Sequence, residues 1–256
     1  MDIKALQEAD YIVHLAGAGV VAKKWTEAYK KEIVNSRTES GRLLVNALKN
    51  NTNTVKAVVS TSAIGWYGAD IKNKESFIET DEAHDDFLGQ TCKLWEESIE
   101  SVTALGKRLV KLRIGIVLSN DGGALAEFKK PLQFGMAAVL GNGKQMLSWI
   151  HIDDLCRLFI KAIEDENLHG SYNAVAPNPV SNKTLTITLA KKMNGRFYIP
   201  FPVPEFVIKL MLGKRSTEVL KSTTVSCKKI TDTGFTFNFD TIDNAMEDLM
   251  KKRSGL

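Results

Sequence analysis

Tyr11-Ile12-Val13-His14-Leu15-Ala16-Gly17-Ala18-Gly19-Val20 is an apolar strand that runs directly into a glycine turn. Residues 17–22 also satisfy the G-x-G-x-x-G/A spacing of a dinucleotide-binding turn, in which glycines let the backbone approach a pyrophosphate. Such a turn opens a helix whose N-terminus stabilises the phosphate charge. Whether this strand is the first of its sheet or a later one therefore determines what the glycines do.

The residues after the turn do not complete a dinucleotide-binding unit. In such a unit the next strand ends in an acidic residue within about 30 residues. Here a helix is predicted at 24–50, and the next strand ends Val58-Val59-Ser60-Thr61-Ser62, without a carboxylate for the ribose hydroxyls. We therefore expect that Gly17 and Gly19 do not cradle phosphates. The alternative is that residues 17–22 are a genuine dinucleotide-binding turn, which predicts that a pyrophosphate binds there.

Composition limits the class of protein. The chain has 256 residues, 44% of them hydrophobic, and a net charge of +4 from lysines scattered without interleaved aromatics, which disfavours nucleic acid as a partner. Cys92, Cys156 and Cys227 are odd in number and widely spaced, which favours a reducing compartment and disfavours a zinc site. No signal peptide or membrane-spanning run is visible. We expect a soluble, cytoplasmic protein with no metal, nucleic-acid or membrane partner.

Helical and extended segments alternate over about two thirds of the chain, which is typical of an α/β fold with a doubly wound parallel sheet. Three prolines between 200 and 204 then precede a short apolar helix at 206–213. We expect a Rossmann-like domain at 1–195 and a small, mostly helical C-terminal subdomain at 196–256. The predicted strands are 11–15, 56–61, 108–116, 148–152 and 170–175, and the predicted helices are 24–50, 85–105, 124–134, 153–164 and 182–194.

Read as a fourth strand, residues 11–15 begin an ordered series of motifs. Leu15-Ala16-Gly17, Val59-Ser60-Thr61-Ser62-Ala63 with Trp66-Tyr67-Gly68, and Trp149-Ile150-His151-Ile152-Asp153-Asp154 together resemble the extended short-chain dehydrogenases/reductases. Further motifs resemble one branch, the atypical NADP-binding epimerase family related to nucleoside-diphosphate-sugar epimerases and cell-division-inhibitor homologues. They are Trp25, Ser36-Arg37, Cys92-Lys93-Leu94-Trp95-Glu96, Gly115-Ile116-Val117-Leu118, Gly122-Gly123-Ala124-Leu125, Gly141-Asn142-Gly143-Lys144-Gln145 and Gly234-Phe235-Thr236-Phe237.

The resemblance implies that three strands and a glycine-rich turn would precede residue 1, so that the sheet is N-terminally truncated. The missing unit would hold the pyrophosphate, and we expect weak or absent NADP(H) binding. The bare edge of Tyr11–Leu15 would favour association, including a homo-oligomer. The implied function is an NADP(H)-dependent oxidoreductase or epimerase acting on a small-molecule or nucleotide-linked substrate. The alternative is a non-catalytic NADP(H)-sensing or protein-interaction module, and whether the chain is an enzyme stays open.

The catalytic Tyr-x-x-x-Lys pair of these enzymes is missing, since Leu88 and Cys92 stand in its places. Leucine carries no exchangeable proton and an unactivated thiol stays protonated at neutral pH. The remaining catalytic candidates are Ser62, at a strand end, and Tyr67, whose alternative role is packing. Cys92 is expected to be a small buried apolar group rather than a nucleophile.

The resemblance also assigns binding residues. Arg37 suits a phosphate because its guanidinium is a permanently charged fork, although a surface arginine paired with a glutamate is the alternative. His151 is a substrate candidate whose alternative role is a hydrogen bond to Asp153 or Asp154. The full cofactor set is Leu15, Ala16, Glu32, Arg37, Ser60, Thr61 and Val117, and the substrate set is Gln145, Trp149 and His151.

Overall fold

The computed structural model describes residues 2–251; Met1 and residues 252–256, which belong to the two expected domains, lie outside that range. The chain divides into two compact units whose segments alternate along the sequence. The first comprises Met1–Gly68, Glu79–Ile114 and Cys156–Ala174, and the second comprises Ala69–Ile78, Gly115–Leu155 and Val175–Leu256. This partition differs from the expected boundary after residue 195, because residues 115–155 and 175–195 share a core with the C-terminal residues.

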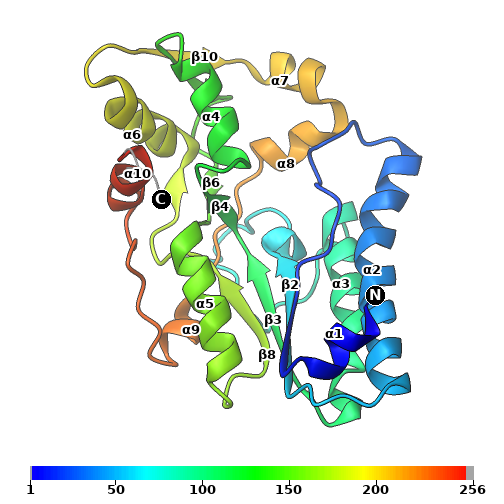
Figure 1. Cartoon of the computed structure of the whole chain (residues 1–256). Helices are drawn as coiled ribbons and strands as arrows, with labels where there is room; N and C mark the ends of the chain where they lie inside the picture. Colours follow the sequence, from blue (N-terminus) through cyan, green and yellow to red (C-terminus); the bar gives the residue numbers. More distant parts are fainter. Residues whose placement is uncertain (1, 252–256) are drawn as a thin grey trace. The chain divides into compact units, whose positions relative to one another are not determined.

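The first unit is built on a parallel sheet with the strand order β1-β2-β3-β8 (Figure 1). The strands are β1 (Tyr11–His14), β2 (Ala57–Ala63), β3 (Arg108–Ile114) and β8 (Gly170–Ala174). Four of the five predicted strands are thereby confirmed to within one or two residues. The fifth, at 148–152, is also confirmed as a strand at Trp149–His151, but it lies in the second unit, where it pairs with residues 116–118.

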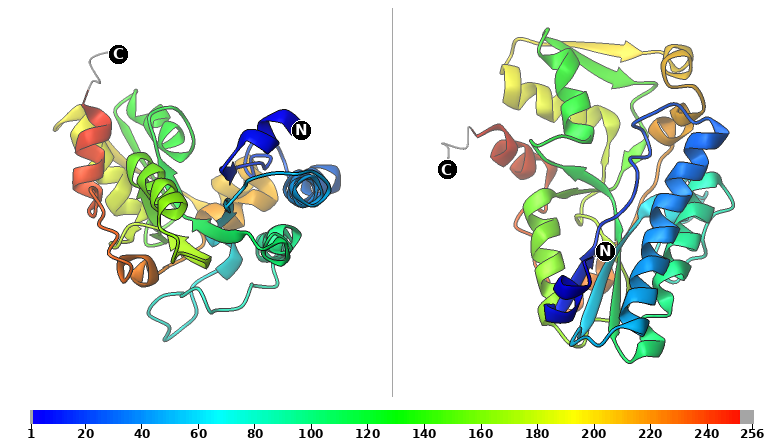
Figure 2. Two further views of the ribbon diagram at one scale, coloured as in Figure 1. Left: turned by 60° about the horizontal axis from the view of Figure 1, so that its bottom comes forward. Right: turned by 45° about the vertical axis from the view of Figure 1, so that its right-hand side comes forward.

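Helices α2 (Glu27–Asn50) and α3 (Phe87–Glu100) lie side by side next to this sheet (Figures 1 and 2). Thr26 and Asp86 cap their N-termini through side-chain oxygens that accept backbone N–H groups. Gly41 allows the close approach of the two helices, because a Cβ there would collide with Ser98. Their apolar faces bury Leu44, Leu48 and Ile99 with Val58 and Leu109 of the sheet. The shorter elements are α1 (Ile3–Glu8), η1 (Ile64–Tyr67) and η2 (Thr103–Leu105).

Helix α5 (Ile152–Glu164) begins in the second unit and ends in the first. Its last turn is held by Arg108, whose guanidinium donates to the carbonyl oxygens of Ala162 at 2.6 Å and Ile163 at 2.7 Å. Carbonyl groups at a helix C-terminus lack partners within the helix, so a cation there stabilises the end.

The described part of the second unit contains three two-stranded sheets. β4 (Ile116–Leu118) pairs in parallel with β7 (Trp149–His151), and β5 (Met136–Leu140) pairs in parallel with β10 (Ile199–Val203). β6 (Met146–Leu147) pairs antiparallel with β9 (Val180–Ser181). The helices are α4 (Ala124–Leu132), α6 (Asn182–Asn194), α7 (Glu205–Leu212), η3 (Gly213–Arg215), α8 (Ser216–Leu220), α9 (Lys228–Thr231) and α10 (Ile242–Met250).

The core of the second unit joins segments far apart in the sequence. Trp149 of β7 and Leu118 of β4 pack in one cluster with Leu185 of α6 and Met246 of α10. Residues of the C-terminal helix α10 therefore share a core with residues 115–155. Among residues 2–251, none of the helices combines the length and the apolar character needed to cross a bilayer.

Candidate functional site

The sheet of the first unit presents a polar face towards the carboxyl ends of its strands. Alternate residues of a strand point to the same face, and the parallel register sets these residues in two rows across the sheet. Such a row is unusual in a parallel sheet, whose strands are normally apolar on both faces. The first row is His14, Ser60, Lys111 and Ser171, and the second is Ser62, Arg113 and Asn173.

A buried ion pair joins this polar face to helix α3. The Arg113 guanidinium donates from Nε to Oε1 of Glu96 at 2.8 Å and from Nη2 to Oε2 at 3.1 Å. Ser171 donates to the same carboxylate at 3.1 Å, and the Lys111 ammonium lies 3.7 Å from it. The guanidinium also stacks over the Trp66 ring, with its carbon 3.6 Å from the ring centroid.

The ionisation of Glu96 is set by this pair. Burial alone would raise the pKa of the Glu96 carboxyl, but the hydrogen bonds and charge of Arg113, followed by the charge of Lys111, hold it below its ordinary value. The Ser62 hydroxyl lies beside the same carboxylate and lowers its pKa further. Ser62 is almost completely buried, so the catalytic candidate belongs to a charged, enclosed cluster rather than to an open surface.

Tyr67, the other catalytic candidate, belongs to the same cluster. Its hydroxyl donates to Oδ1 of Asn173 at 2.6 Å and accepts from Nη1 of Arg113 at 3.0 Å. Burial raises the pKa of Tyr67 to about 12, although Arg113 partly opposes the shift. An efficient general acid or base has a pKa near the working pH, so these contacts favour the packing role for Tyr67.

His14 and Ser60 form a second buried polar contact, at the ends of β1 and β2. The Ser40 hydroxyl donates to backbone carbonyls of its own helix, so it accepts from Nε2 of His14 at 3.0 Å. Nδ1 of His14 is then the acceptor for the Ser60 hydroxyl, 3.1 Å away. Burial lowers the pKa of His14, which keeps the ring neutral. Thr61 donates to the carbonyl oxygen of His14 at 3.1 Å and fixes the same strand end.

The loop after β1 exposes two large apolar side chains, Leu15 directly after the strand and Val21 further along. Leu15 is 62% exposed, whereas Ala16 beside it is half-buried. Gly17 packs against Arg37, so that a Cβ at position 17 would lie 3.0 Å from the guanidinium carbon. Arg37 is buried, donates from Nη1 to the carbonyls of Ala18 at 2.9 Å and Ile33 at 3.0 Å, and lies over Trp95. It therefore clamps this loop to α2 and is not a surface residue paired with a glutamate.

The glycine turn does not open a helix. A short turn with a hydrogen bond from Ala22 N to Gly19 O follows it, and α2 begins only at Glu27. Neither Gly17 nor Gly19 has a positive φ. The turn therefore lacks the helix N-terminus that a phosphate-binding turn supplies, a feature that is consistent with the expectation that Gly17 and Gly19 do not cradle phosphates. Glu32, on the exposed side of α2, pairs with Lys23 at 3.4 Å.

The places of the missing Tyr-x-x-x-Lys pair are apolar. Cys92 is buried, and burial raises the pKa of its thiol to about 12. Leu88 and Cys92 both pack against Gly65. The prediction that Cys92 is a buried apolar group is confirmed, and no proton donor stands at either position.

The remaining candidates lie in the second unit. Val117 is the middle residue of β4. Gln145 is buried and donates from Nε2 to the Leu140 carbonyl at 3.1 Å. Trp149 is fully buried and donates from its indole to the Asn178 carbonyl at 3.0 Å. Gln145 and Trp149 therefore make hydrogen bonds inside the second unit. Their role in substrate binding stays a prediction.

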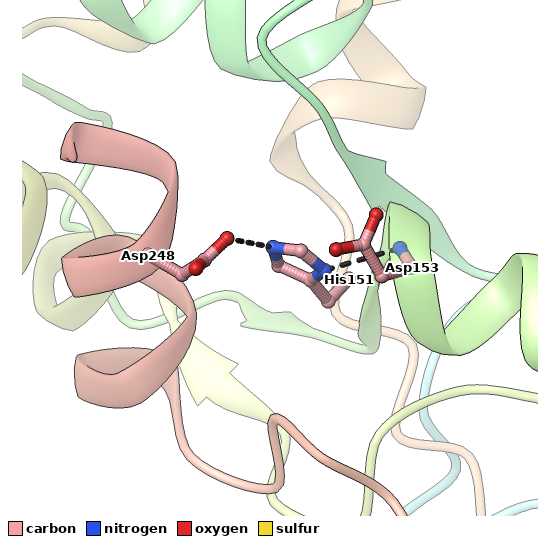
Figure 3. Close-up of side chains that lie close together, drawn as sticks. All are labelled: His151, Asp153 and Asp248. Atoms are coloured by element: carbon pink, nitrogen blue, oxygen red, sulfur yellow. Dashed lines mark hydrogen bonds and ion pairs between the residues drawn. The ribbon is translucent and has the colours of Figure 1, made fainter. Parts of the chain in front are cut away.

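His151 lies between two carboxylates from different helices (Figure 3). Its Nδ1 accepts the backbone N–H of Asp153 at 3.1 Å, which confirms the expected hydrogen bond at the start of α5. Nε2 lies 3.5 Å from Oδ2 of Asp248 on α10, and the ring stacks on Phe239. Ligand atoms of His151, Asp153 and Asp248 lie within 4.8 Å of one another, close enough to consider a metal.

The hydrogen bond at Nδ1 argues against a metal in this cluster. Because Nδ1 accepts a backbone N–H, the proton of the neutral His151 ring sits on Nε2, which then points at Asp248. A metal on Nε2 would force that proton onto Nδ1, against the Asp153 N–H. The geometry suits a histidine–carboxylate contact better than a metal centre.

Sequence reasoning missed His14, Glu96, Arg113 and Asn173. A signal for the last two was present, since Lys111 and Arg113 alternate with apolar residues in β3 and Ser171 and Asn173 do so in β8. Glu96 was quoted only as part of a motif, and its partner lies 17 residues away on another element. Only the register of the sheet and the position of α3 bring them together.

Comparison with known proteins shows extensive similarity. The chain is 35% identical over 255 residues to an epimerase family protein of Staphylococcus aureus (strain NCTC 8325 / PS 47), a match that covers 97% of this chain and 82% of the relative. It is 36% identical over 244 residues to an epimerase family protein of Staphylococcus haemolyticus (strain JCSC1435), covering 95% and 80%. Residues 203–249 match a family model described as a domain of unknown function, DUF1731.

Solved structures agree with these relatives. The human epimerase family protein SDR39U1 (isoform 2), crystallised with NADPH, superposes with a TM-score of 0.88 at 27% identity over 96% of this chain and 83% of that one. A nucleoside-diphosphate sugar epimerase from Corynebacterium glutamicum gives a TM-score of 0.74 at 29% identity, covering 96% and 47%. UDP-N-acetylglucosamine 4-epimerase from Bacillus cereus, at 16% identity and a TM-score of 0.77, shows the same fold, covering 99% and 82%.

Proposed function

Because this chain belongs to the epimerase family, with a Rossmann-like α/β fold, we propose that it binds NADP(H) at the carboxyl ends of β1 and β2 and acts on a small-molecule or nucleotide-linked substrate. The human relative was crystallised with NADPH, which supports this cofactor. Parallel α/β sheets bind ligands outside the carboxyl ends of their strands. The pairing of His14 with Ser60 brings the loop after β1 and the Ser60–Ser62 segment to that edge of the sheet.

One observation carries the proposal: the exposed Leu15 side chain follows directly on a strand whose end is fixed by buried hydrogen bonds. An exposed apolar side chain on a rigid support suits the flat face of a nucleotide base or a nicotinamide. Arg37 lies behind the same loop, with only Nη1 committed to the Ala18 and Ile33 carbonyls. Its other N–H groups suit a phosphate oxygen, because a guanidinium binds such oxygens in pairs.

The phosphate contacts of this site are few. The turn Gly17–Gly19 supplies no helix N-terminus, so the pyrophosphate gains no dipole stabilisation from α2. We therefore expect saturable but weak binding, in keeping with the expectation from the sequence.

When bound, NADPH would supply a hydride. The chain's own contribution would be to orient a substrate hydroxyl, and the Ser62 oxygen is the candidate acceptor. Its setting beside the Glu96 carboxylate makes Ser62 a better orienting group than a proton source, because that carboxylate is held ionised by Arg113. Tyr67 then supports Arg113 and Asn173 rather than exchanging a proton.

The alternative function, a non-catalytic NADP(H)-sensing or protein-interaction module, is favoured by a different observation. Leu88 and Cys92 occupy the places of the usual acid–base pair, and the thiol is protonated at neutral pH because burial raises its pKa to about 12. The fold retained by such a module would still bind the dinucleotide. The two functions therefore differ in turnover and not in binding.

Oxidation of NADPH against a panel of aldehydes, ketones and nucleotide sugars separates the two. Turnover above the rate of NADPH alone supports the enzyme, and loss of that turnover in Ser62→Ala, with NADPH affinity unchanged, supports the orienting role of Ser62. Thr103→Ala, which alters an exposed hydroxyl of η2, is the matched control. Binding without turnover across the panel supports the module.

A further inference from the structure

The sheet formed by β5 and β10 has one apolar face that the described residues of the second unit, up to Lys251, leave exposed. In register, Met136 pairs with Ile199 and Ala138 with Phe201. The intervening residue Ala137 points to the opposite face and is buried in the core of the unit. Ile199 and Phe201 are both exposed, so the outer face of this sheet presents large apolar side chains to solvent.

Neighbouring segments extend this surface. Phe134 and Phe197 stand just before the two strands, where Gly135 accepts the Ile199 N–H at 2.8 Å, and Phe197 is 88% exposed. Helix α7 follows β10 after Pro204 and packs inward through Ile208, yet it leaves Leu210 84% exposed. A helix that is apolar on both sides is normally covered on both. The apolar surface comprises Phe134, Met136, Phe197, Ile199, Phe201, Phe206, Leu210 and Met211.

The free edge of β10 is closed to another strand. Ile199 donates its N–H to β5 and the Val203 carbonyl accepts from Gly141, so odd-numbered residues of β10 direct their backbone groups towards β5. The outward backbone positions are Pro200 and Pro202, which have no N–H. A partner strand would find no donors there. The apolar surface must therefore be covered by side-chain contact, not by extension of the sheet.

The charges around the apolar surface select the partner. Between residues 196 and 215 the sequence carries four basic residues, Arg196, Lys209, Lys214 and Arg215, against one acidic residue, Glu205. The one acidic residue lies 3.7 Å from Lys209, and both side chains are exposed. In a two-fold dimer this patch would face itself and bring positive charge against positive charge. A partner with a negatively charged surface and an apolar interior would complement both the basic residues and the apolar side chains.

We propose that this surface docks on an anionic lipid bilayer, with the aromatic side chains entering the headgroup boundary and the basic residues contacting lipid phosphates. Exposed Phe and Leu side chains beside Lys and Arg form the pattern by which peripheral segments lie in a membrane interface. The sequence-based expectation of no membrane partner rested on the lack of a spanning run, which does not bear on surface docking. The proposal is independent of NADP(H) binding.

Co-sedimentation of the full chain with vesicles tests it, using phosphatidylcholine vesicles with and without phosphatidylserine. The expected result is binding only to vesicles with phosphatidylserine, reduced by high salt. Phe206→Ser with Leu210→Ser is expected to weaken binding at least about tenfold, as is Lys209→Glu with Lys214→Glu. Leu43→Ser, an exposed apolar residue of α2, is the matched control and should bind as the unaltered chain does.

Three outcomes would overturn the proposal. They are no binding to either vesicle, equal binding to both, or a dimer in sedimentation velocity that Phe206→Ser with Leu210→Ser converts to monomer. The last would assign the surface to a second copy of the chain. Circular dichroism of each variant confirms that a loss of binding is not a loss of fold, since the altered side chains are exposed.

Discussion

Arg113 holds both carboxylate oxygens of Glu96 in the interior of the first unit, at 2.8 and 3.1 Å, with side chains that are 4% and 6% exposed. The pair joins β3 to α3, and Arg113 also donates to the Tyr67 hydroxyl, which in turn donates to Asn173. The rigidity of the proposed site therefore depends on one buried ion pair. Four predictions can be measured separately: the first two concern this pair and its neighbour Tyr67, and the other two concern His14 and Arg37.

Arg113→Met should destabilise the protein strongly. It leaves the Glu96 carboxylate buried with Lys111 as its nearest remaining cation and Ser171 as a hydroxyl donor, and the loss of one partner from a buried pair costs about 3–5 kcal/mol. The free energy of unfolding from urea titration measures the change. Glu100→Gln, which alters an exposed partner of Lys111, is the control and should change stability by less than about 0.5 kcal/mol. A loss below about 1 kcal/mol in Arg113→Met would show that the pair is not structural.

Tyr67 should stay protonated far above neutral pH. Burial raises its pKa to about 12, so the difference in tyrosinate absorbance between the unaltered chain and Tyr67→Phe should show no ionisation between neutral pH and pH 10. Tyr67→Phe should also cost about 1–3 kcal/mol of stability, because Asn173 and Arg113 each lose a buried partner. An ionisation step near neutral pH would restore Tyr67 as an acid–base candidate.

His14 should make the first unit sensitive to acid. Burial lowers the pKa of His14 below the 6.5 of an unfolded chain, so the unfolded state takes up the proton first. Its contribution to stability is complete above pH 6.5 and is lost as the pH falls through the lower folded pKa. His14→Gln keeps polar atoms near Ser40 and Ser60 without titrating, and should flatten the fall in stability below that pH. His169→Gln, at an exposed position, is the control and should leave the pH-dependent loss of stability unchanged. If His14→Gln loses as much stability on acidification as the unaltered chain does, His14 is not the cause of that loss.

Arg37 should give the chain a higher affinity for NADPH than for NADH. If its remaining N–H groups bind the additional phosphate of NADPH, Arg37→Gln loses a charge-assisted contact worth about 1.5–3 kcal/mol, or about ten- to a hundredfold in affinity. NADH affinity should change little. Equal weakening for both nucleotides would instead assign Arg37 only to clamping the loop through the Ala18 carbonyl. Competition binding with both nucleotides makes the comparison.

Much of the fold followed from local pattern. The strands at 11–14, 57–63, 108–114 and 170–174 and the helix at 182–194 are visible as apolar runs, turns and caps in the sequence. The sequence did not show which strand the segment 148–152 pairs with, because a short apolar run carries no such information; burial of Trp149 against α6 and α10 decides that. The same packing places 115–155 with the C-terminal residues.

The candidate site was only partly accessible to sequence reasoning. Leu15, Ser60 and Ser62 were proposed because the motifs that contain them resemble motifs of the extended short-chain dehydrogenases/reductases, not because a local pattern marks them as a site. The Arg113–Glu96 pair and the His14–Ser60 contact depend on sheet register and helix position, which no local pattern encodes. The apolar surface of β5, β10 and α7 is a property of the folded unit, since the same residues would read as core in the sequence.

Calorimetric titration of NADPH into the purified chain tests the proposed function most directly. The account predicts saturable binding with a dissociation constant on the order of 0.1–1 mM, because the edge of β1 and β2 contacts the nucleotide while Gly17–Gly19 supplies no phosphate cradle. Leu15→Asp should weaken it about tenfold, since an exposed apolar contact becomes a charge facing phosphates. The absence of saturable binding at millimolar NADPH, or binding that Leu15→Asp leaves unchanged, would contradict a cofactor site at this edge.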